Sequence, residues 1–235
     1  MSSTRDIKVV AFDLDDTLWP IAPTIDRAER AMTDWIASQY PHVVGQFDIN
    51  TLRLLRASLL AGDPTLKNNV LGLRLGTIRA AFADAGETQA AADRAFEVFS
   101  EHRNRVEFYP DALPALERLK QQFRLAVISN GFANVKAIGI DNHFETVVSA
   151  HEVGVSKPDP KIYAACIART GLAPEQIIYV GDDPANDVIG PYTAGMQAAW
   201  INRRARPWPE EHAHIDEPPQ FHDLTEFADW LLAPG

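Results

Sequence analysis

The chain has 235 residues, 46% of them hydrophobic and 23% charged, which is the composition of an ordinary globular protein. This composition excludes collagen-like, coiled-coil and intrinsically disordered chains. The formal net charge of −10, from 32 acidic and 22 basic residues, opposes binding to nucleic acid and to anionic membranes, so neither is expected as a partner.

Cysteine content and hydropathy indicate the compartment. The single cysteine, Cys166, can form no intrachain disulfide and therefore favours a reducing environment. Residues 1–8 are mostly polar, and no apolar run approaches the ~20 residues that span a bilayer. A cytoplasmic protein is therefore expected.

The first predicted element is a buried strand over residues 7–14, in which apolar, β-prone residues follow one another almost without interruption. Residues 20–104 then show only helical periodicity, with four helical faces and no strand between them. Four successive helices predict a small bundle inserted into another fold. The residues on these faces are Ile25, Ala28, Met32, Trp35 and Ile36; Leu52, Leu55 and Leu59; Leu71, Leu75, Ile78 and Phe82; and Ala92, Phe96, Phe99 and His102.

Strands and helices alternate after Pro110, up to a proline-rich loop at 203–222 and a last helix that Asp223 caps. This alternation predicts an α/β fold with a doubly wound parallel sheet, formed by residues 1–19 and 105–235. Residues 20–104 would be the inserted four-helix domain. The predicted helices cover 113–119, 133–138, 160–169 and 185–194, and the predicted strands cover 125–129, 146–149, 176–180 and 197–201.

The residues that follow the predicted strands are polar and rich in aspartate. In a parallel α/β sheet, ligands bind where the strands end, so these residues are expected to meet at one edge. They are Asp13, Asp15, Asp16 and Thr17 after the first strand, Ser129, Asn130 and Gly131 after the second, Lys157 beyond the third, and Gly181, Asp182, Asp183 and Asp187 after the fourth.

A set of carboxylates at one point requires a cation. Two carboxylates 4 Å apart repel each other by roughly 4 kcal/mol at an effective dielectric constant of 20. Oxygen ligands with room for water favour Mg²⁺ over zinc, so Mg²⁺ is the predicted cofactor. Lys157 adds a positive charge, and Ser129, Asn130 and the amide of Gly131 add neutral donors. Together they predict a receptor for the phosphoryl group of a small phosphorylated metabolite.

Asp13, Asp15 and Lys157 are the predicted catalytic residues. Asp13 can attack phosphorus and form an aspartyl phosphate. Asp15 can protonate the leaving oxygen and later deprotonate the attacking water. Lys157 and Mg²⁺ would neutralise charge on the transferring group. The predicted activity is phosphomonoester hydrolysis.

Four short motifs carry a resemblance to a known family. They are Phe12-Asp13-Leu14-Asp15-Asp16-Thr17-Leu18, Ser129-Asn130-Gly131, Ser156-Lys157-Pro158-Asp159-Pro160, and Gly181-Asp182-Asp183 followed by Asp187. In this order they resemble the four motifs of the haloacid dehalogenase superfamily, over essentially the whole chain. The helical insert lies where that family places its cap domain. The resemblance therefore implies a Rossmann-like core and a helical cap that closes over the substrate.

The resemblance also implies a role for each motif residue. Asp13 would be the nucleophile and Asp15 the acid and base, while Ser129 and Lys157 would bind the phosphate. The positions that it implies for Mg²⁺ are Asp13, the main-chain carbonyl of Asp15, Asp182, and either Asp183 or Asp187, the last two acting through a water or by orienting the lysine.

Within this superfamily the chain looks most similar to phosphatases of flavin mononucleotide and of 5-amino-6-(5-phospho-D-ribitylamino)uracil. A substrate from riboflavin biosynthesis is therefore expected. One departure is Pro191, where these proteins have a small residue in the helix after the fourth motif. Proline removes one backbone hydrogen bond and is expected to kink that helix without affecting catalysis. The similarity includes residues 15–18, 156–158, 181–183 and 195–198.

Other functions fit parts of the pattern. A sugar phosphomutase would keep all four motifs and would return the phosphate to a substrate instead of to water. Phosphatases of nucleoside monophosphates, phosphosugars or phosphoglycolate are further alternatives. A dehalogenase of this fold is disfavoured because it lacks an acid at the position of Asp15. A receiver-type signalling domain is disfavoured because its phosphorylated aspartate follows an internal strand and because it has no inserted bundle.

Overall fold

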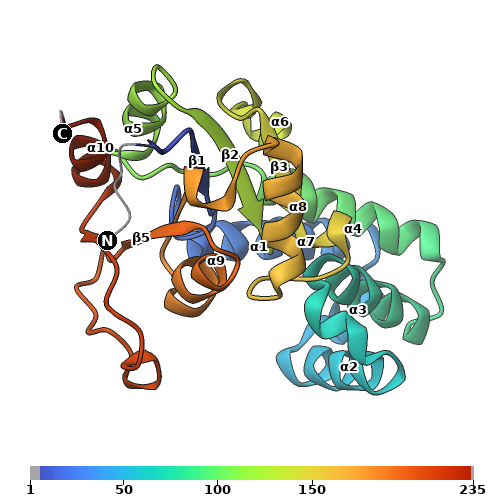
Figure 1. Cartoon of the computed structure of the whole chain (residues 1–235). Helices are drawn as coiled ribbons and strands as arrows, with labels where there is room; N and C mark the ends of the chain where they lie inside the picture. Colours follow the sequence, from blue (N-terminus) through green and yellow to red (C-terminus); the bar gives the residue numbers. More distant parts are fainter. Residues whose placement is uncertain (1–5, 234–235) are drawn as a thin grey trace. The chain divides into compact units, whose positions relative to one another are not determined.

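The computed structural model describes residues 6–233 (Figure 1). Residues 1–5 and 234–235, which the sequence analysis assigns to the two ends of the α/β core, lie outside the described residues. The described chain divides into two compact units. The α/β unit contains residues 6–20, 107–130 and 139–233, and the helical unit contains residues 21–106 and 131–138. The sequence analysis places 131–138 in the α/β core, whereas the structure groups this segment with the helices.

The α/β unit is built on one six-stranded sheet of order β3-β2-β1-β4-β5-β6, in which all neighbouring strands are parallel. The predicted doubly wound sheet is thereby confirmed. The strand order reverses between β1 and β4, which is where sheets of this type bind ligands. The strands are β1 (Val9–Phe12), β2 (Arg124–Ser129), β3 (Thr146–Ser149), β4 (Ile177–Gly181), β5 (Gln197–Ile201) and β6 (Gln220–Phe221).

The register of the central strands aligns their ends. Phe12 on β1 pairs with Val127 on β2 and with Val180 on β4. All four residues of β1 are buried, as expected for a strand covered on both faces. The chain after Phe12 and the chain after Val180 therefore leave the sheet side by side, and this positions the residues that follow them.

The strand β6 lies within the segment that the sequence analysis predicts to be a loop. It pairs in parallel with β5, Trp200 lying opposite Gln220 and Ile201 opposite Phe221. The strand has only two residues and follows two prolines, so its sequence shows no strand periodicity.

Alternate side chains of the sheet form a buried core with α8 on one face, and Cys166 is fully buried in this core. The helices α5 and α10 pack against each other and belong to the other face (Figure 1). Aspartates cap two of the helices: Asp159 accepts a hydrogen bond from Lys161 N, and Asp223, the predicted cap of the last helix, accepts one from Glu226 N. The helices of this unit are α5 (Ala112–Leu119), α7 (Ala150–Val153), α8 (Pro160–Thr170), α9 (Gly190–Thr193) and α10 (Leu224–Leu232).

The helix predicted at 185–194 is divided in two. A π-helical turn covers Pro184–Ile189, and α9 starts at Gly190. The backbone at Ile189 and Gly190 is right-handed helical, so the π-helical turn continues directly into α9, and Pro191 donates no backbone hydrogen bond within this stretch. The change from π-helical to α-helical winding lies next to Pro191.

The helical unit contains the four predicted helices. Polar side chains cap three of them: Asp48 accepts from the start of α2, Asn69 from the start of α3 and Thr88 from the start of α4. Its core joins α1, α3 and α4 around Phe82 and Phe99. Among residues 6–233, no helix combines the length and hydropathy needed to cross a bilayer. The helices are α1 (Ile21–Gln39), α2 (Ile49–Gly62), α3 (Val70–Asp84), α4 (Gln89–Arg103) and the single turn α6 (Val135–Ile138).

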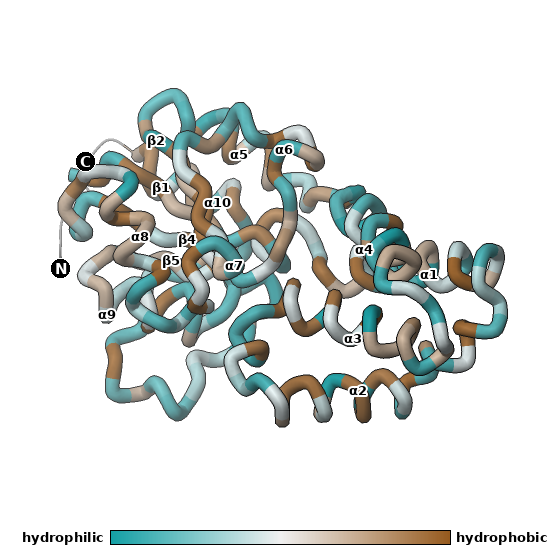
Figure 2. Tube along the Cα trace, turned by 90° about the vertical axis from the view of Figure 1, so that its right-hand side faces the viewer, coloured by the Kyte–Doolittle hydropathy of each residue, from teal (hydrophilic) through white to brown (hydrophobic). Residues whose placement is uncertain are grey.

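Helix α2 differs from the other three long helices of this unit because none of its residues is buried. Its predicted face of Leu52, Leu55 and Leu59 is only half-buried. Figure 2 shows hydrophobic residues distributed along α2, and two of them, Ile49 and Leu54, are 83% and 66% exposed. Helical periodicity therefore predicted the position of this helix correctly but not the extent of its burial.

Candidate active site

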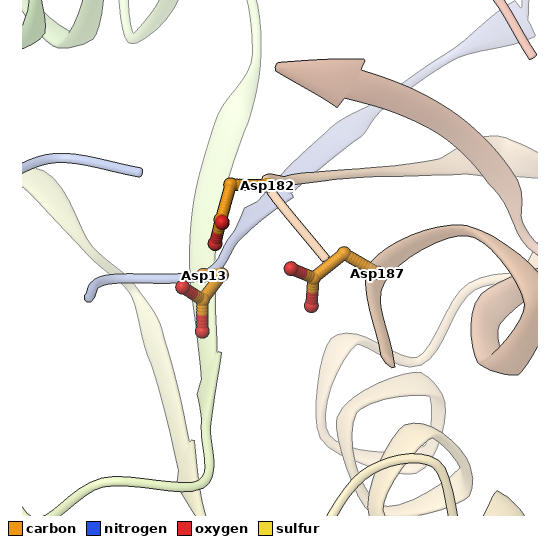
Figure 3. Close-up of side chains that lie close together, drawn as sticks. All are labelled: Asp13, Asp182 and Asp187. Carbon is orange, nitrogen blue, oxygen red and sulfur yellow. The ribbon is translucent and has the colours of Figure 1, made fainter. Parts of the chain in front are cut away.

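Three carboxylates meet where β1 and β4 end. Asp13 directly follows β1, and its amide donates to Val180 O at 2.9 Å, which ties the end of β1 to β4. Asp182 follows β4, and Asp187 lies in the π-helical turn after it. One carboxylate oxygen from each of the three lies within 4.8 Å of the others. Figure 3 shows the three side chains converging from the ends of these elements.

Lys157 provides the positive charge at this cluster. Its Nζ donates to Asp13 Oδ1 at 2.7 Å, to Asp187 Oδ1 at 2.8 Å and to Tyr179 Oη at 2.8 Å. The Lys157 side chain is 3% exposed, so these three bonds use all of its donors away from water. A buried ammonium with two carboxylate partners can hold a nucleophile and neutralise the group that it attacks.

Burial and charge act together on this pair. Burial raises the pKa of Asp13 well above its usual range, while the charge on Lys157 acts in the opposite direction. Burial also disfavours the charged form of Lys157, but Asp13 and Asp187 outweigh it and hold the pKa of Lys157 well above its ordinary value. The lysine therefore stays charged, and a further cation at the cluster would favour the ionised form of Asp13.

Asn130 fixes the main chain of the lysine. Lys157 N donates to Asn130 Oδ1 at 2.6 Å, and Asn130 Nδ2 donates to Lys157 O at 3.1 Å. Both ends of the amide contact the main chain of Lys157, which gives Asn130 a positioning role. The predicted donation from Asn130 to a phosphate stays a prediction.

Two side chains that were not predicted from the sequence, those of Trp200 and Arg206, donate hydrogen bonds to Asp182. Its main-chain carbonyl accepts from Trp200 Nε1 at 2.9 Å and from Arg206 Nη2 at 2.8 Å. Burial raises the pKa of Asp182 to about 7, and the charges on Asp187 and Asp16 act in the same direction. A carboxylate with this pKa requires a positive charge to be fully ionised at neutral pH.

Asp183 and Asp187 have distinct roles in the geometry. Asp183 Oδ1 accepts from Asn186 N and caps the π-helical turn. Asp187 Oδ1 accepts from Lys157, and its Oδ2 accepts from Asp183 N at 3.0 Å. A Cβ at Gly181 would overlap the Asp187 carboxyl group, so the chain needs glycine at that position. Asp187 is thus the residue that orients the lysine, and Asp183 shapes the turn that carries it.

The segment after Asp13 folds into a tight loop. Asp16 has φ = 63°, in the left-handed region that aspartate tolerates, and its amide donates to Trp19 O at 2.7 Å. Trp19 Nε1 donates to Asp15 Oδ1 at 2.8 Å, so the indole orients the predicted acid and base. Thr17 Oγ1 lies 3.4 Å from Asp13 Oδ2. The side chain of Asp15 is not one of the three grouped carboxylates.

Two predicted phosphate-binding residues lie at the end of β2. Ser129 is 4% exposed and pairs with Ser149 on β3. Gly131 follows two residues later and opens the segment that groups with the helical unit. Of the predicted site residues, the structure therefore gathers Asp13, Lys157, Asp182 and Asp187 at one point.

Tyr179 is a site residue that the sequence analysis missed. It lies inside β4, accepts from Lys157 Nζ, and donates to Ile128 O at 2.7 Å. Burial raises its pKa well above the ordinary value, so the phenol keeps the proton that it donates. Its position in an apolar strand indicates a core residue, and only the hydrogen bond from Lys157 in the folded chain reveals its place in the site.

The donors at the cluster fit a divalent cation of the Mg²⁺ type. The grouped ligand atoms are all carboxylate oxygens, and no histidine or cysteine joins the group among residues 6–233. Asp13 and Asp182 could hold the ion, whereas Asp187 is committed to Lys157 and to Asp183 N.

Comparisons with known proteins agree with this site. The model of the haloacid dehalogenase-like hydrolase family matches residues 7–195. The chain is 32% identical over 199 residues to the 5-amino-6-(5-phospho-D-ribitylamino)uracil phosphatase of Escherichia coli, covering 83% of each protein. It is 31% identical over 225 residues to the glyceraldehyde 3-phosphate phosphatase of Methanopyrus kandleri, covering 92% of each.

A solved structure is similar over nearly the whole length. The 2-haloacid dehalogenase of Pseudomonas syringae superposes with a TM-score of 0.90 at 36% sequence identity, covering 96% of this chain and 98% of that one. The matched segment includes all four motifs and the three grouped carboxylates. The chain therefore belongs to the haloacid dehalogenase-like hydrolase family and is an enzyme with phosphatases among its relatives.

Proposed function

We propose that this enzyme is a Mg²⁺-dependent phosphomonoesterase that works through an aspartyl phosphate on Asp13. The observation that carries the proposal is the buried ion pair of Asp13 with Lys157, 2.7 Å apart, beside Asp182. This arrangement holds an aspartate oxygen next to a fixed positive charge and next to ligands for a cation. A phosphoryl group is the electrophile that benefits from both.

In the first step a carboxylate oxygen of Asp13 forms a bond to phosphorus, and the bond from phosphorus to the ester oxygen breaks. The leaving oxygen takes a proton from Asp15 and departs as the alcohol. In the second step Asp15 accepts a proton from water, whose oxygen attacks phosphorus while the bond to Asp13 breaks. Inorganic phosphate leaves, and both carboxylates return to their starting forms.

The remaining residues position the two catalytic aspartates and neutralise the charge of the phosphoryl group. Lys157 holds Asp13 and offsets the charge of the phosphoryl oxygens, and Asp187 orients Lys157. Trp19 donates to one oxygen of Asp15 and so fixes the orientation of the carboxyl group that transfers the proton. Asp13, Asp182 and the Asp15 carbonyl would hold Mg²⁺, which would supply a positive charge that polarises the phosphoryl group.

The structural similarity to a 2-haloacid dehalogenase favours a second candidate, displacement of halide from a 2-haloacid by Asp13. Two features favour the phosphatase over it. A halide leaves without a proton and has no need of Asp15, and carbon attack has no need of a cation site such as Asp13 with Asp182. The phosphatase is therefore the first candidate.

For the substrate we propose a small phosphomonoester, with flavin mononucleotide and 5-amino-6-(5-phospho-D-ribitylamino)uracil as the first candidates. The 32% identity to the E. coli phosphatase of the second compound supports this choice. The similarity to a glyceraldehyde 3-phosphate phosphatase supports a smaller phosphorylated metabolite as the alternative.

The test measures phosphate release with Mg²⁺ from flavin mononucleotide, 5-amino-6-(5-phospho-D-ribitylamino)uracil, glyceraldehyde 3-phosphate and p-nitrophenyl phosphate. It also measures chloride release from 2-chloropropionate. Asp13→Asn is the control for contaminating activity. Phosphate release that a chelator stops and that Asp13→Asn lacks is the expected result. Halide release without phosphate release would replace the proposal by the dehalogenase. Transfer of the phosphoryl group to an acceptor sugar phosphate, without release of inorganic phosphate, would replace it by a mutase.

A further inference from the structure

A second cation, Arg206, lies beside the carboxylate cluster. Its Nη2 donates to the main-chain carbonyl of Asp182 at 2.8 Å and lies 3.6 Å from the Oδ2 of the same residue. The Arg206 side chain is 46% exposed, so water reaches it, whereas the Asp182 side chain is 27% exposed. Both residues line a pocket of about 110 Å³ in the α/β unit.

A turn closed by Asn202 fixes the main chain of Arg206. Arg206 N donates to Asn202 Oδ1 at 2.9 Å, and Asn202 Nδ2 donates to Arg206 O at 2.8 Å. Asn202 is 5% exposed at the end of β5, so the anchor is part of the core. Ala205, directly before the arginine, has φ = 49°, a conformation that alanine rarely adopts outside a constrained turn. The guanidinium also lies 5.9 Å from the ring of Trp200.

Arg206 acts on Asp182 in two ways, through a hydrogen bond to the main-chain carbonyl and through its charge beside the carboxylate. Trp200 Nε1 donates to the same carbonyl at 2.9 Å, so the main chain of Asp182 keeps a donor when Arg206 is replaced. What a replacement removes is the positive charge beside the Asp182 carboxylate. That charge attracts the carboxylate and repels any cation that the carboxylate binds.

We infer that Arg206 is an electrostatic regulator of divalent-cation binding: it competes with Mg²⁺ for Asp182 and weakens the affinity of the site. The inference rests on the metal site of the proposed function and adds to it the residue that sets its affinity. Arg206 acts through Asp182 and is therefore a positioning residue rather than a catalytic one.

The test compares Mg²⁺ binding to the full chain by isothermal titration calorimetry at low ionic strength. Arg206→Gln is expected to bind Mg²⁺ about three- to tenfold more tightly than wild type, the range for one partly solvated charge near the site. Arg206→Lys keeps the positive charge and is expected to stay within about twofold of wild type. The gain in Arg206→Gln is expected to shrink in 0.5 M NaCl, since salt screens a charge that water reaches.

Arg204→Gln is the matched control. Arg204 lines the same pocket, is exposed, and forms no hydrogen bond or ion pair that the described residues record, so its replacement changes the net charge equally without touching Asp182. Equal affinities of Arg206→Gln and Arg204→Gln, or weaker binding by Arg206→Gln, would overturn the inference while leaving the proposed function intact. Failure of the wild-type protein to bind Mg²⁺ would overturn both.

Discussion

The two cations at the carboxylate cluster have the same kind of anchor and different surroundings. Lys157 is held through its main chain by the amide of Asn130, and Arg206 is held in the same way by the amide of Asn202. Lys157 is 3% exposed and has three hydrogen-bond acceptors, whereas Arg206 is 46% exposed and has one. An asparagine at a strand end thus places a cation, but burial decides how strongly that cation is coupled to its carboxylates.

This difference predicts that changes on the lysine side have large effects and that changes on the arginine side adjust the site. The largest effect is expected for Asp13→Asn. An amide cannot form the aspartyl phosphate, so kcat should fall by at least about 10³-fold, while the substituted side chain keeps the shape of the aspartate. The measurement is turnover of p-nitrophenyl phosphate with Mg²⁺, together with circular dichroism to establish folding. Residual activity above a thousandth of wild type in folded protein would contradict the role of nucleophile.

Removal of the buried cation should have the next largest effect, on stability. Lys157→Met leaves Asp13 and Asp187 facing each other without a counter-charge, and breaking a buried ion pair in this way costs about 3–5 kcal/mol. Urea denaturation without Mg²⁺ measures the free energy of unfolding. Lys161→Met, at an exposed position on α8, is the matched control. A loss below about 1 kcal/mol would mean that the pair contributes little to the fold.

On the arginine side of the cluster, Asp182 is expected to make metal binding depend on pH. The pKa of Asp182 is about 7 in the folded chain and close to its ordinary value of 3.8 in the unfolded one. Because this pKa is raised, the contribution of Asp182 to the stability of the metal-free protein is fully present below pH 3.8 and is lost as the pH rises through 7. Protons and Mg²⁺ therefore compete for Asp182 in the folded protein.

We expect the affinity for Mg²⁺ to rise about tenfold between pH 6 and pH 8, because the ionised fraction of a group with a pKa near 7 rises by that factor. Calorimetric titrations at several pH values measure it. In Asp182→Asn the pH dependence should largely disappear along with most of the affinity. A wild-type affinity that is the same at pH 6 and pH 8 would contradict the raised pKa.

The lysine side of the site could be predicted from the sequence, whereas the arginine side could not. Asp13, Lys157 and Asp182 were predicted because they follow strand ends, and parallel register brings strand ends to one edge. Arg206 was missed because it lies in a proline-rich segment whose pattern indicates only a loop. Its position depends on a turn that Asn202 closes and on pairing of the two-residue strand β6, and neither leaves a periodic signal.

Roles were harder to predict than positions. The sequence did not predict that Asn130 holds the main chain of Lys157, because the groups that an amide contacts depend on where another loop passes. The choice between Asp183 and Asp187 was open in the sequence for the same reason. The bend of the π-helical turn makes Asp183 its cap and turns Asp187 toward the lysine.

The smallest predicted effect concerns a single hydroxyl on the lysine side. Tyr179→Phe removes one acceptor from Lys157 and the donor that Ile128 O receives, but both carboxylate partners of the lysine remain. The expected loss is about 1–2 kcal/mol of unfolding free energy, the cost of leaving a buried carbonyl without its donor. Tyr40→Phe in the helical unit is the control, because its hydroxyl forms no hydrogen bond that the described residues record. Urea denaturation of both variants measures the difference, and equal stabilities would place the positioning of Lys157 with Asp13 and Asp187 alone.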